Sequence, residues 1–246
     1  MISMSNAKRE AFLENVKALR KVLIVSVAGI VVLFLVLFYG FCTPLMDFIL
    51  SPVRNRGINI IATAVSEALL TQMKVCLVGA VVCTMPLITQ QIWGFISPAL
   101  YPEERKTFAL LFWIALVLFM AGVAFCYLYV FPLAIDLFWT SADGVATAMW
   151  SVDEYYGFVL SFVLPFGLMF ELPVALYMLA KHGKVTYSTL TKSRKYVLLL
   201  IFVVAAILTP PDVVSQIMLA IPIYALFEIS VQIVRVMNKK IQESAD

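Results

Sequence analysis

Residues 22–41 read VLIVSVAGIVVLFLVLFYGF, a run of 20 residues that contains no charged side chain. The hydrocarbon core of a bilayer is about 30 Å thick, and a helix needs about 20 apolar residues to cross it. The whole chain is 63% hydrophobic and 13% charged, with a mean hydropathy of +0.97, whereas soluble domains are about one quarter charged. These values exclude a soluble globular protein and predict an integral membrane protein.

Five further apolar runs follow, at residues 75–93, 107–131, 155–180, 196–208 and 213–234. We therefore predict an all-α integral membrane protein, with a single membrane domain over residues 1–246 that contains six transmembrane helices. The fifth run has only 13 residues, which cover about 20 Å at about 1.5 Å per residue. Either the bilayer thins around this short fifth helix or flanking residues extend it.

A turn is predicted between the fifth and sixth runs, at Thr209-Pro210-Pro211-Asp212. Paired prolines end a helix, and Asp212 can cap the next one through the free N–H groups of its first turn. The last two runs should form a compact hairpin.

Basic residues lie mainly on one side of the predicted spans. Only Arg54 and Arg56 fall on the other side, and Lys74 lies at the start of the second span. The positive-inside rule places both termini and the loop at residues 95–106 in the cytoplasm. Residues 1–21 then form a cytoplasmic amphipathic segment and residues 235–246 a cytoplasmic tail. The net charge of +3 is spread along one membrane face, which does not indicate nucleic-acid binding. The basic residues of the cytoplasmic side are Lys8, Arg9, Lys17, Arg20, Lys21, Arg105, Lys106, Lys181, Lys184, Lys192, Arg194, Lys195, Arg235, Lys239 and Lys240.

The two outer segments, residues 43–67 and 132–154, are long enough to be structured. In the first, Leu45, Phe48 and Ile49 form an apolar face, which predicts a short helix on the outer surface. In the second, Trp139 and Trp150 indicate an aromatic belt at headgroup depth.

No cofactor or metal site is indicated. The four cysteines, Cys42, Cys76, Cys83 and Cys126, lie in or beside apolar runs without a Cys-x-x-Cys pair and are interpreted as packing residues. His182 has neither a catalytic partner nor a metal ligand set nearby in the sequence.

An acidic pair, Glu103-Glu104, lies between the second and third apolar runs, close after Phe95. Carboxylates accept the forked N–H donors of arginine in bidentate geometry, so this loop is suited to bind a basic peptide at the membrane surface. The alternative is an ordinary solvated loop charge.

Glu171 lies within the fourth apolar run, two residues before Pro173. A charge inside the membrane costs several kcal/mol unless it faces a partner or water, and proline leaves a backbone carbonyl without its usual donor. We interpret Glu171 as a functional acid beside a kink; the alternative is an acid paired internally. Glu228 and Gln232, one helical turn apart, are expected to cap or pack.

Several short motifs, in this order and on six spans, closely resemble the TatC family, the C subunit of the twin-arginine protein translocase. They are Arg20-Lys21, Phe95-Ile96-x-Pro98-Ala99-Leu100-Tyr101 with Glu104-Arg105, Phe131-Pro132-Leu133, Phe170-Glu171-Leu172-Pro173-Val174, Arg194-x-Tyr196, Leu208-Thr209-Pro210-Pro211-Asp212 with Ser215-Gln216, and Ala220-Ile221-Pro222.

The resemblance implies a receptor, not an enzyme, that binds twin-arginine signal peptides. It would form the core of a complex that exports folded proteins across the bacterial cytoplasmic membrane with the proton-motive force and no nucleotide. The implied partners are the single-span subunits TatA and TatB, together with further copies of the chain.

The resemblance also implies site residues. In the family, the acid matching Glu104 binds the arginines of the signal peptide, with Glu103 beside it and Phe95 nearby. The N-terminal segment with Arg20 completes the site. The family's glutamate in that segment is here Ala18, and Glu14, one turn earlier, could point the same way.

Inside the membrane, Glu171 matches an acid expected to face a concave groove. Thr209 and Gln216, with Asp212 between them, match positions where TatA and TatB dock. A short fifth helix would thin the membrane there and ease cargo movement.

Two other classes remain open from the residues alone. A secondary transporter would use Glu171 and Asp212 as a proton relay, although the repeats usual in such folds are not evident. An intramembrane protease would need a base, and the single histidine lies in a predicted cytoplasmic loop.

Overall fold

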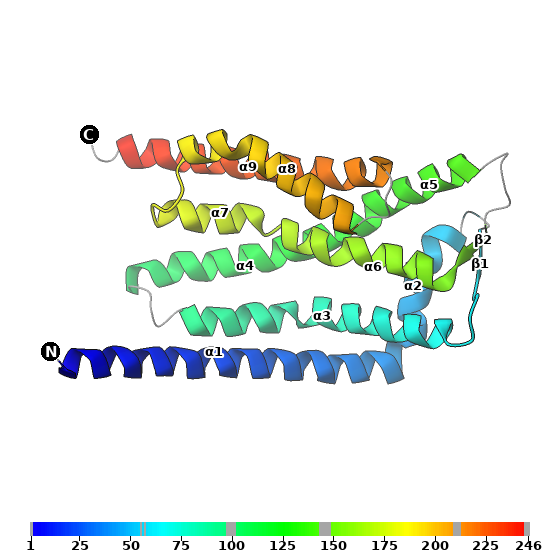
Figure 1. The fold of residues 1–246 in the computed structure, drawn as a ribbon, viewed down its shortest axis with the longest axis horizontal. Coiled ribbons are helices and arrows are strands. Elements are labelled where there is room, and N and C mark those ends of the chain that lie inside the picture. The colour runs from blue at the N-terminus through cyan, green and yellow to red at the C-terminus, as the bar shows by residue number, and fades with distance from the viewer. Residues whose placement is uncertain are drawn as a thin grey trace. The chain divides into compact units, whose positions relative to one another are not determined.

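Across the part of the chain that it describes, the computed structural model contains six helical segments (Figure 1). The structure describes residues 2–54, 56, 58–96, 102–142, 149–208 and 213–243. Each predicted apolar run lies in a different segment, so the prediction of an all-helical membrane protein is confirmed.

Three of the segments contain more than one element. The first comprises α1 (Ile2–Val36), the π-helical turn η1 (Leu37–Phe41) and α2 (Cys42–Arg54). The third comprises α4 (Pro102–Phe125), a second π-helical turn (Cys126–Val130) and α5 (Phe131–Ala142). The fourth is divided into α6 (Val152–Met169) and α7 (Leu172–Lys181). The remaining segments are α3 (Glu67–Ile96), α8 (Tyr187–Leu208) and α9 (Val213–Glu243).

Among the described residues, five helical stretches are long and apolar enough to cross a membrane: Val16–Arg54, Glu67–Ile92, Thr107–Thr140, Val152–Lys181 and Val213–Lys239. The fifth segment, α8, is not among them. Its apolar part is short, as predicted, but flanking polar residues extend the helix to 22 residues. Flanking residues thus do extend the short run, and thinning of the bilayer around it stays a prediction.

The chain forms two compact units. Met1–Leu45 and Gln72–Leu116 make the first, and Met46–Thr71 and Val117–Asp246 make the second. In the first unit, α1 and α3 pack closely at small residues. A Cβ atom added at Gly29 would lie 3.2 Å from the Thr84 side chain. Residues this small let two membrane helices approach each other.

The core of the second unit is aromatic where α4 and α6 meet. Phe119, Phe162 and Phe166 are fully buried there. A separate apolar cluster joins α7, α8 and α9, made of Ala180, Leu190, Phe227, Val231 and Val234. The same unit holds a parallel pair of short strands, β1 (Asn59–Ile61) and β2 (Met149–Ser151), with Ile60 opposite Trp150.

Hydrogen bonds fasten α2 to the rest of the second unit. The hydroxyl groups of Tyr155 and Tyr156 donate to the carbonyl oxygens of Ile49 and Met46, at 2.7 and 2.9 Å. The predicted short helix near Phe48 is confirmed as α2. The single membrane domain, the cytoplasmic termini and the concave groove stay predictions.

Candidate functional site

The predicted peptide-binding residues all belong to the first unit. Glu14, Ala18 and Arg20 lie on α1, which is one uninterrupted helix from Ile2 to Val36. Residues four apart lie on the same face of a helix, so Glu14 occupies the face of Ala18 one turn earlier. Arg20 is exposed, and the side chain of Glu14 lies outside those that the structure describes.

The acid pair belongs to the first turn of a helix. Phe95 lies in the last turn of α3, and Glu103 and Glu104 follow Pro102 at the start of α4. Proline suits the first helical position because its missing N–H would have no partner there. The free N–H groups of a first turn stabilise negative charge, so this position favours ionised carboxylates. The side chains of these three residues lie outside the described part.

Glu171 lies where the fourth segment breaks. Phe170 and Glu171 form a turn between α6 and α7, in which the Glu171 N–H donates to the Leu168 carbonyl oxygen at 3.1 Å. Pro173 has no N–H to donate to the Met169 carbonyl, which is why a regular helix cannot continue here. The helix is interrupted at the predicted kink.

The Glu171 side chain is half-buried, and its carboxylate does not cap α7. Among the residues that the structure describes, no basic side chain forms an ion pair with it. Its carboxylate is therefore not used to stabilise the described fold, unlike the other acids of the second unit described below.

Of the predicted docking residues, only Gln216 lies in the described part, because Thr209 and Asp212 fall in residues 209–212. The Gln216 side-chain amide donates to the Phe202 carbonyl oxygen at 2.8 Å. This bond links α9 to α8 near the predicted hairpin turn, so Gln216 has a structural contact in addition to its predicted role.

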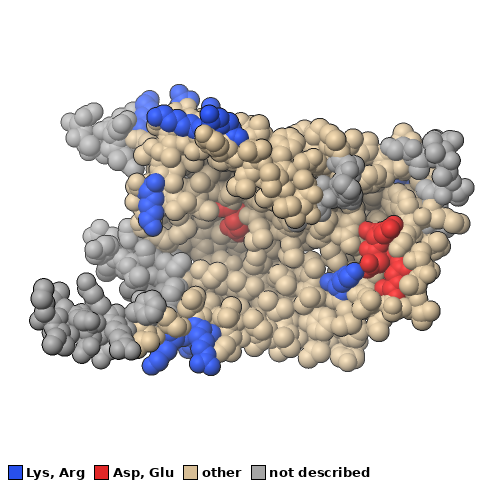
Figure 2. Space-filling model, viewed as in Figure 1, with Lys and Arg blue, Asp and Glu red and all other residues tan. Residues whose placement is uncertain are grey.

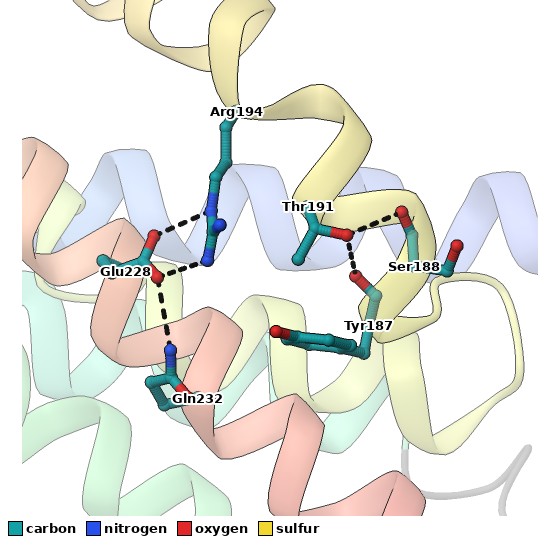
Figure 3. A network of polar contacts seen from close by, with 6 residues as sticks. All are labelled: Tyr187, Ser188, Thr191, Arg194, Glu228 and Gln232. Carbon is teal, nitrogen blue, oxygen red and sulfur yellow. Dashed lines mark hydrogen bonds and ion pairs between the residues drawn. The ribbon is translucent and has the colours of Figure 1, made fainter.

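An ion pair joins α8 to α9 (Figure 3). Arg194 donates from Nη2 to Oε1 of Glu228 at 2.5 Å and from Nε to Oε2 at 3.1 Å, and Gln232 donates to the same carboxylate at 3.2 Å. This is the bidentate geometry that favours arginine over lysine. Sequence reasoning expected Glu228 and Gln232 to cap or pack and did not identify the pair, although Arg194 belongs to one of the family motifs.

Glu67 was also not identified from the sequence. It is buried, with 7% of its surface exposed, and accepts hydrogen bonds from Thr63, Ala64, Ser151 and Asp153. Its carboxylate thus connects the start of α3 to the start of α6. A glutamate that reaches back to N–H groups three and four residues earlier resembles a capping box, and this is the one local signal that could have revealed it.

Charges in the second unit are separated along its length (Figure 2). Basic residues gather over the α7–α8 connection and α8, whereas acidic residues gather near the strand pair. The surface between the two groups is mostly uncharged and is interrupted by one acidic patch. This distribution within one unit agrees with the one-sided pattern of lysine and arginine in the sequence.

Comparison with known proteins identifies the family. Residues 14–222 match the family Sec-independent protein translocase protein (TatC). The chain is 36% identical over 228 residues to Sec-independent protein translocase protein TatC of Carboxydothermus hydrogenoformans, covering 92% of this chain and 93% of that one. It is 35% identical over 246 residues to the Haemophilus influenzae protein of the same name, covering 98% and 96%.

The fold agrees with solved structures. A crystal structure of the twin-arginine translocase receptor TatC superimposes with a TM-score of 0.83 at 34% identity, covering 90% of this chain and 98% of that one. A second crystal structure of this receptor, in the detergent DDM, also has a TM-score of 0.83. The chain is thus a multi-pass membrane protein that belongs to the TatC family of Sec-independent protein translocases.

Proposed function

We propose that this protein is the receptor subunit of a twin-arginine translocase. In this role it binds twin-arginine signal peptides and forms the core of a complex that exports folded proteins with the proton-motive force. The observation that carries the proposal is its likeness, over 90% of the chain, to a solved protein described as the twin-arginine translocase receptor. The protein supplies binding and assembly, not catalysis of a reaction.

The acid pair at the start of α4 is proposed to bind the two arginines of the signal peptide, with Glu104 as the main contact and Glu103 beside it. Exposed ion pairs contribute about 0–1 kcal/mol each and are screened by salt. The pair therefore provides specificity for arginine. Most of the affinity comes from burial of the signal's apolar segment, at about 25 cal/mol per Å². Phe95, Arg20 and Glu14 are proposed to complete the surface.

The test is equilibrium binding of the full chain in lipid nanodiscs to a twin-arginine signal peptide and its twin-lysine variant. We expect about 3- to 10-fold preference for arginine, because lysine lacks the planar fork and the pairs are exposed. Glu104→Gln should remove the preference. Glu154→Gln is the matched control, since Glu154 is an exposed glutamate in the first turn of another helix, α6. Equal binding of both peptides by the unaltered protein would refute this reading.

The same assay tests the N-terminal contribution. If Glu14 takes the place of the family glutamate at position 18, Glu14→Gln should weaken arginine preference, and Ala18→Glu should restore it in that variant. If Glu14→Gln kept the full preference for the twin-arginine peptide, recognition of the arginines would belong to the acids of α4 alone.

We further propose that Glu171 receives a polar group from the signal peptide or from a partner helix. Its position within an apolar span, with no ion pair among the described residues, supports this role. An acid left without a protein cation inside a membrane is costly, and an incoming donor lowers that cost.

The α8–α9 hairpin, with Thr209, Asp212 and Gln216, is proposed to dock the single-span subunits TatA and TatB. Exposed apolar side chains on both helices, among them Ile207 at 77% and Ile221 at 64%, support a helix-binding surface. A photo-crosslinker placed at position 207 should capture a single-span partner in membranes. One at Leu128, which is also exposed, should not. Equal crosslinking of the partner at positions 207 and 128 would contradict a docking site specific to the α8–α9 hairpin.

A further inference from the structure

A basic pocket opens in the second unit, between the α7–α8 connection, the first turn of α8 and the last turns of α9. Its volume is about 730 Å³, within the range of about 300–1,000 Å³ that holds small ligands. Three basic residues line it, Lys181, Arg235 and Lys239. Thr186 and Ser188 add hydroxyl groups, and no acidic residue is among the described residues that line it.

The pocket is expected to lie where a membrane changes from hydrocarbon to headgroups. Lys181 and Lys239 belong to the basic residues that the positive-inside rule places on the cytoplasmic side. On the hydrocarbon side of the pocket, the apolar cluster of α7, α8 and α9 begins, with Ala180 and Val234 buried. A ligand that is charged at one end and apolar at the other matches this arrangement.

Glu228, an acid on the same helix as Arg235 and Lys239, already has a basic partner. Glu228 forms its bidentate pair with Arg194 on α8 (Figure 3). Arg235, in contrast, lies over the ring of Tyr187 at 5.6 Å from the ring centroid, and Tyr187 packs on the apolar cluster. A cation–π contact holds a guanidinium in place through the face of the ring and takes up none of its N–H donors, so the planar fork of Arg235 can still bind a phosphate.

We infer that this pocket binds the phosphate headgroup of an anionic phospholipid. Basic pockets between membrane helices bind such headgroups because the phosphate meets several cations while its acyl chains remain in the bilayer. In this pocket, Arg235, Lys181 and Lys239 bind the phosphate oxygens, and the hydroxyl groups of Thr186 and Ser188 donate to oxygens of the headgroup. The inference does not depend on the proposed receptor function.

The experiment counts lipids retained by the full chain in native mass spectrometry, during titration with phosphatidylglycerol or with phosphatidylcholine. The test variant is Arg235→Gln with Lys239→Gln. The control is Lys192→Gln with Lys195→Gln, which removes the same charge from two exposed lysines on α8. Since each basic residue near an anionic lipid contributes about fivefold in affinity, the test variant should bind phosphatidylglycerol about 25-fold more weakly. The control should bind like the unaltered protein.

Three results would overturn the inference. Equal losses in the test and control variants would mean that net charge alone attracts the lipid. Equal retention of both lipids by the unaltered protein would exclude recognition of an anionic headgroup. Displacement of phosphatidylglycerol by inorganic phosphate at equal concentration would assign the pocket to a free anion. Should the double variant fail to fold, Lys181→Gln alone tests the same claim, with an expected loss of about fivefold at an unchanged unfolding temperature.

Discussion

Replacing Gly122 by alanine should destabilise the second unit, because α4 and α6 cross there with no room for a side chain. A Cβ atom at Gly122 would lie 2.7 Å from the carbonyl oxygen of Phe166 and 2.8 Å from the Phe170 ring. At Gly167, on the facing helix, it would lie 2.6 Å from the Phe119 ring.

The size of the effect follows from these distances. Ordinary contact begins at 3.4 Å, so the helices must separate by about 0.7 Å at Gly122. Overfilling a packed core costs about 1–3 kcal/mol. A backbone carbonyl cannot rotate away as a side chain can, so we expect about 2–3 kcal/mol for Gly122→Ala. The Phe119 ring can turn, and Gly167→Ala should cost about 1–2 kcal/mol.

Thermal unfolding of the purified protein in detergent measures the effect. For a chain of this size, about 2–3 kcal/mol lowers Tm by about 4–12 °C. Gly157→Ala, in the same helix as Gly167, is the control, because a Cβ atom there meets nothing within 4 Å and alanine favours a helix over glycine. If Gly122→Ala unfolded at the same temperature as Gly157→Ala, the close crossing would not exist as described.

Three further predictions concern the acids. Glu67→Ala should speed hydrogen exchange of the Asp153 amide about tenfold, because alanine has no side-chain oxygen to accept the bond that this amide now donates; mass spectrometry of exchanged peptides measures this. Arg194→Lys and Glu228→Gln should show a coupling of about 1–2 kcal/mol in a double-mutant cycle of unfolding, because their pair is bidentate but about one third exposed. Glu171→Gln should keep most export of a folded reporter, and Glu171→Leu should lose it, since only glutamine can still accept a hydrogen bond.

Each of these has a result that would contradict it. Unchanged exchange at Asp153 would mean that Glu67 does not hold the start of α6. Additive effects in the double-mutant cycle would reduce the pair to two independent surface charges. Full export by the leucine variant would leave Glu171 with no role in transport.

The six helical segments could be predicted because apolar runs of membrane length leave few other structures possible. Their ends could not all be predicted this way. The fifth run was counted from Tyr196, yet α8 begins at Tyr187, where the Thr186 hydroxyl accepts from the Thr189 N–H. The added part of the helix includes Arg194, which has its partner on α9. That partner is 34 residues away, and hydropathy along the chain contains no information about it.

In the candidate site, too, some features could be predicted from the sequence and others could not. The helix break beside Glu171 could be predicted, because Pro173 marks it; the role of Glu171, a single acid in an apolar run, stays a prediction. The contacts of Glu67 could not be predicted, because two of its donors, Ser151 and Asp153, lie more than 80 residues away. The two π-helical turns also left no signal in the apolar pattern, since one inserted residue does not change the composition of a run.

The distance along the chain between Arg194 and Glu228 also bears on how the protein is made. Arg194 leaves the ribosome 34 residues before Glu228, and α8 alone is not among the stretches apolar enough to cross the membrane. A helix with only 13 apolar residues and an arginine at their edge that has not yet met its partner is poorly released into lipid. We therefore expect α8 to wait at the translocon until α9 emerges, so that the two helices enter the bilayer together. A chain ending after α8 should leave that helix accessible to a membrane-impermeant label, and the full chain should protect it.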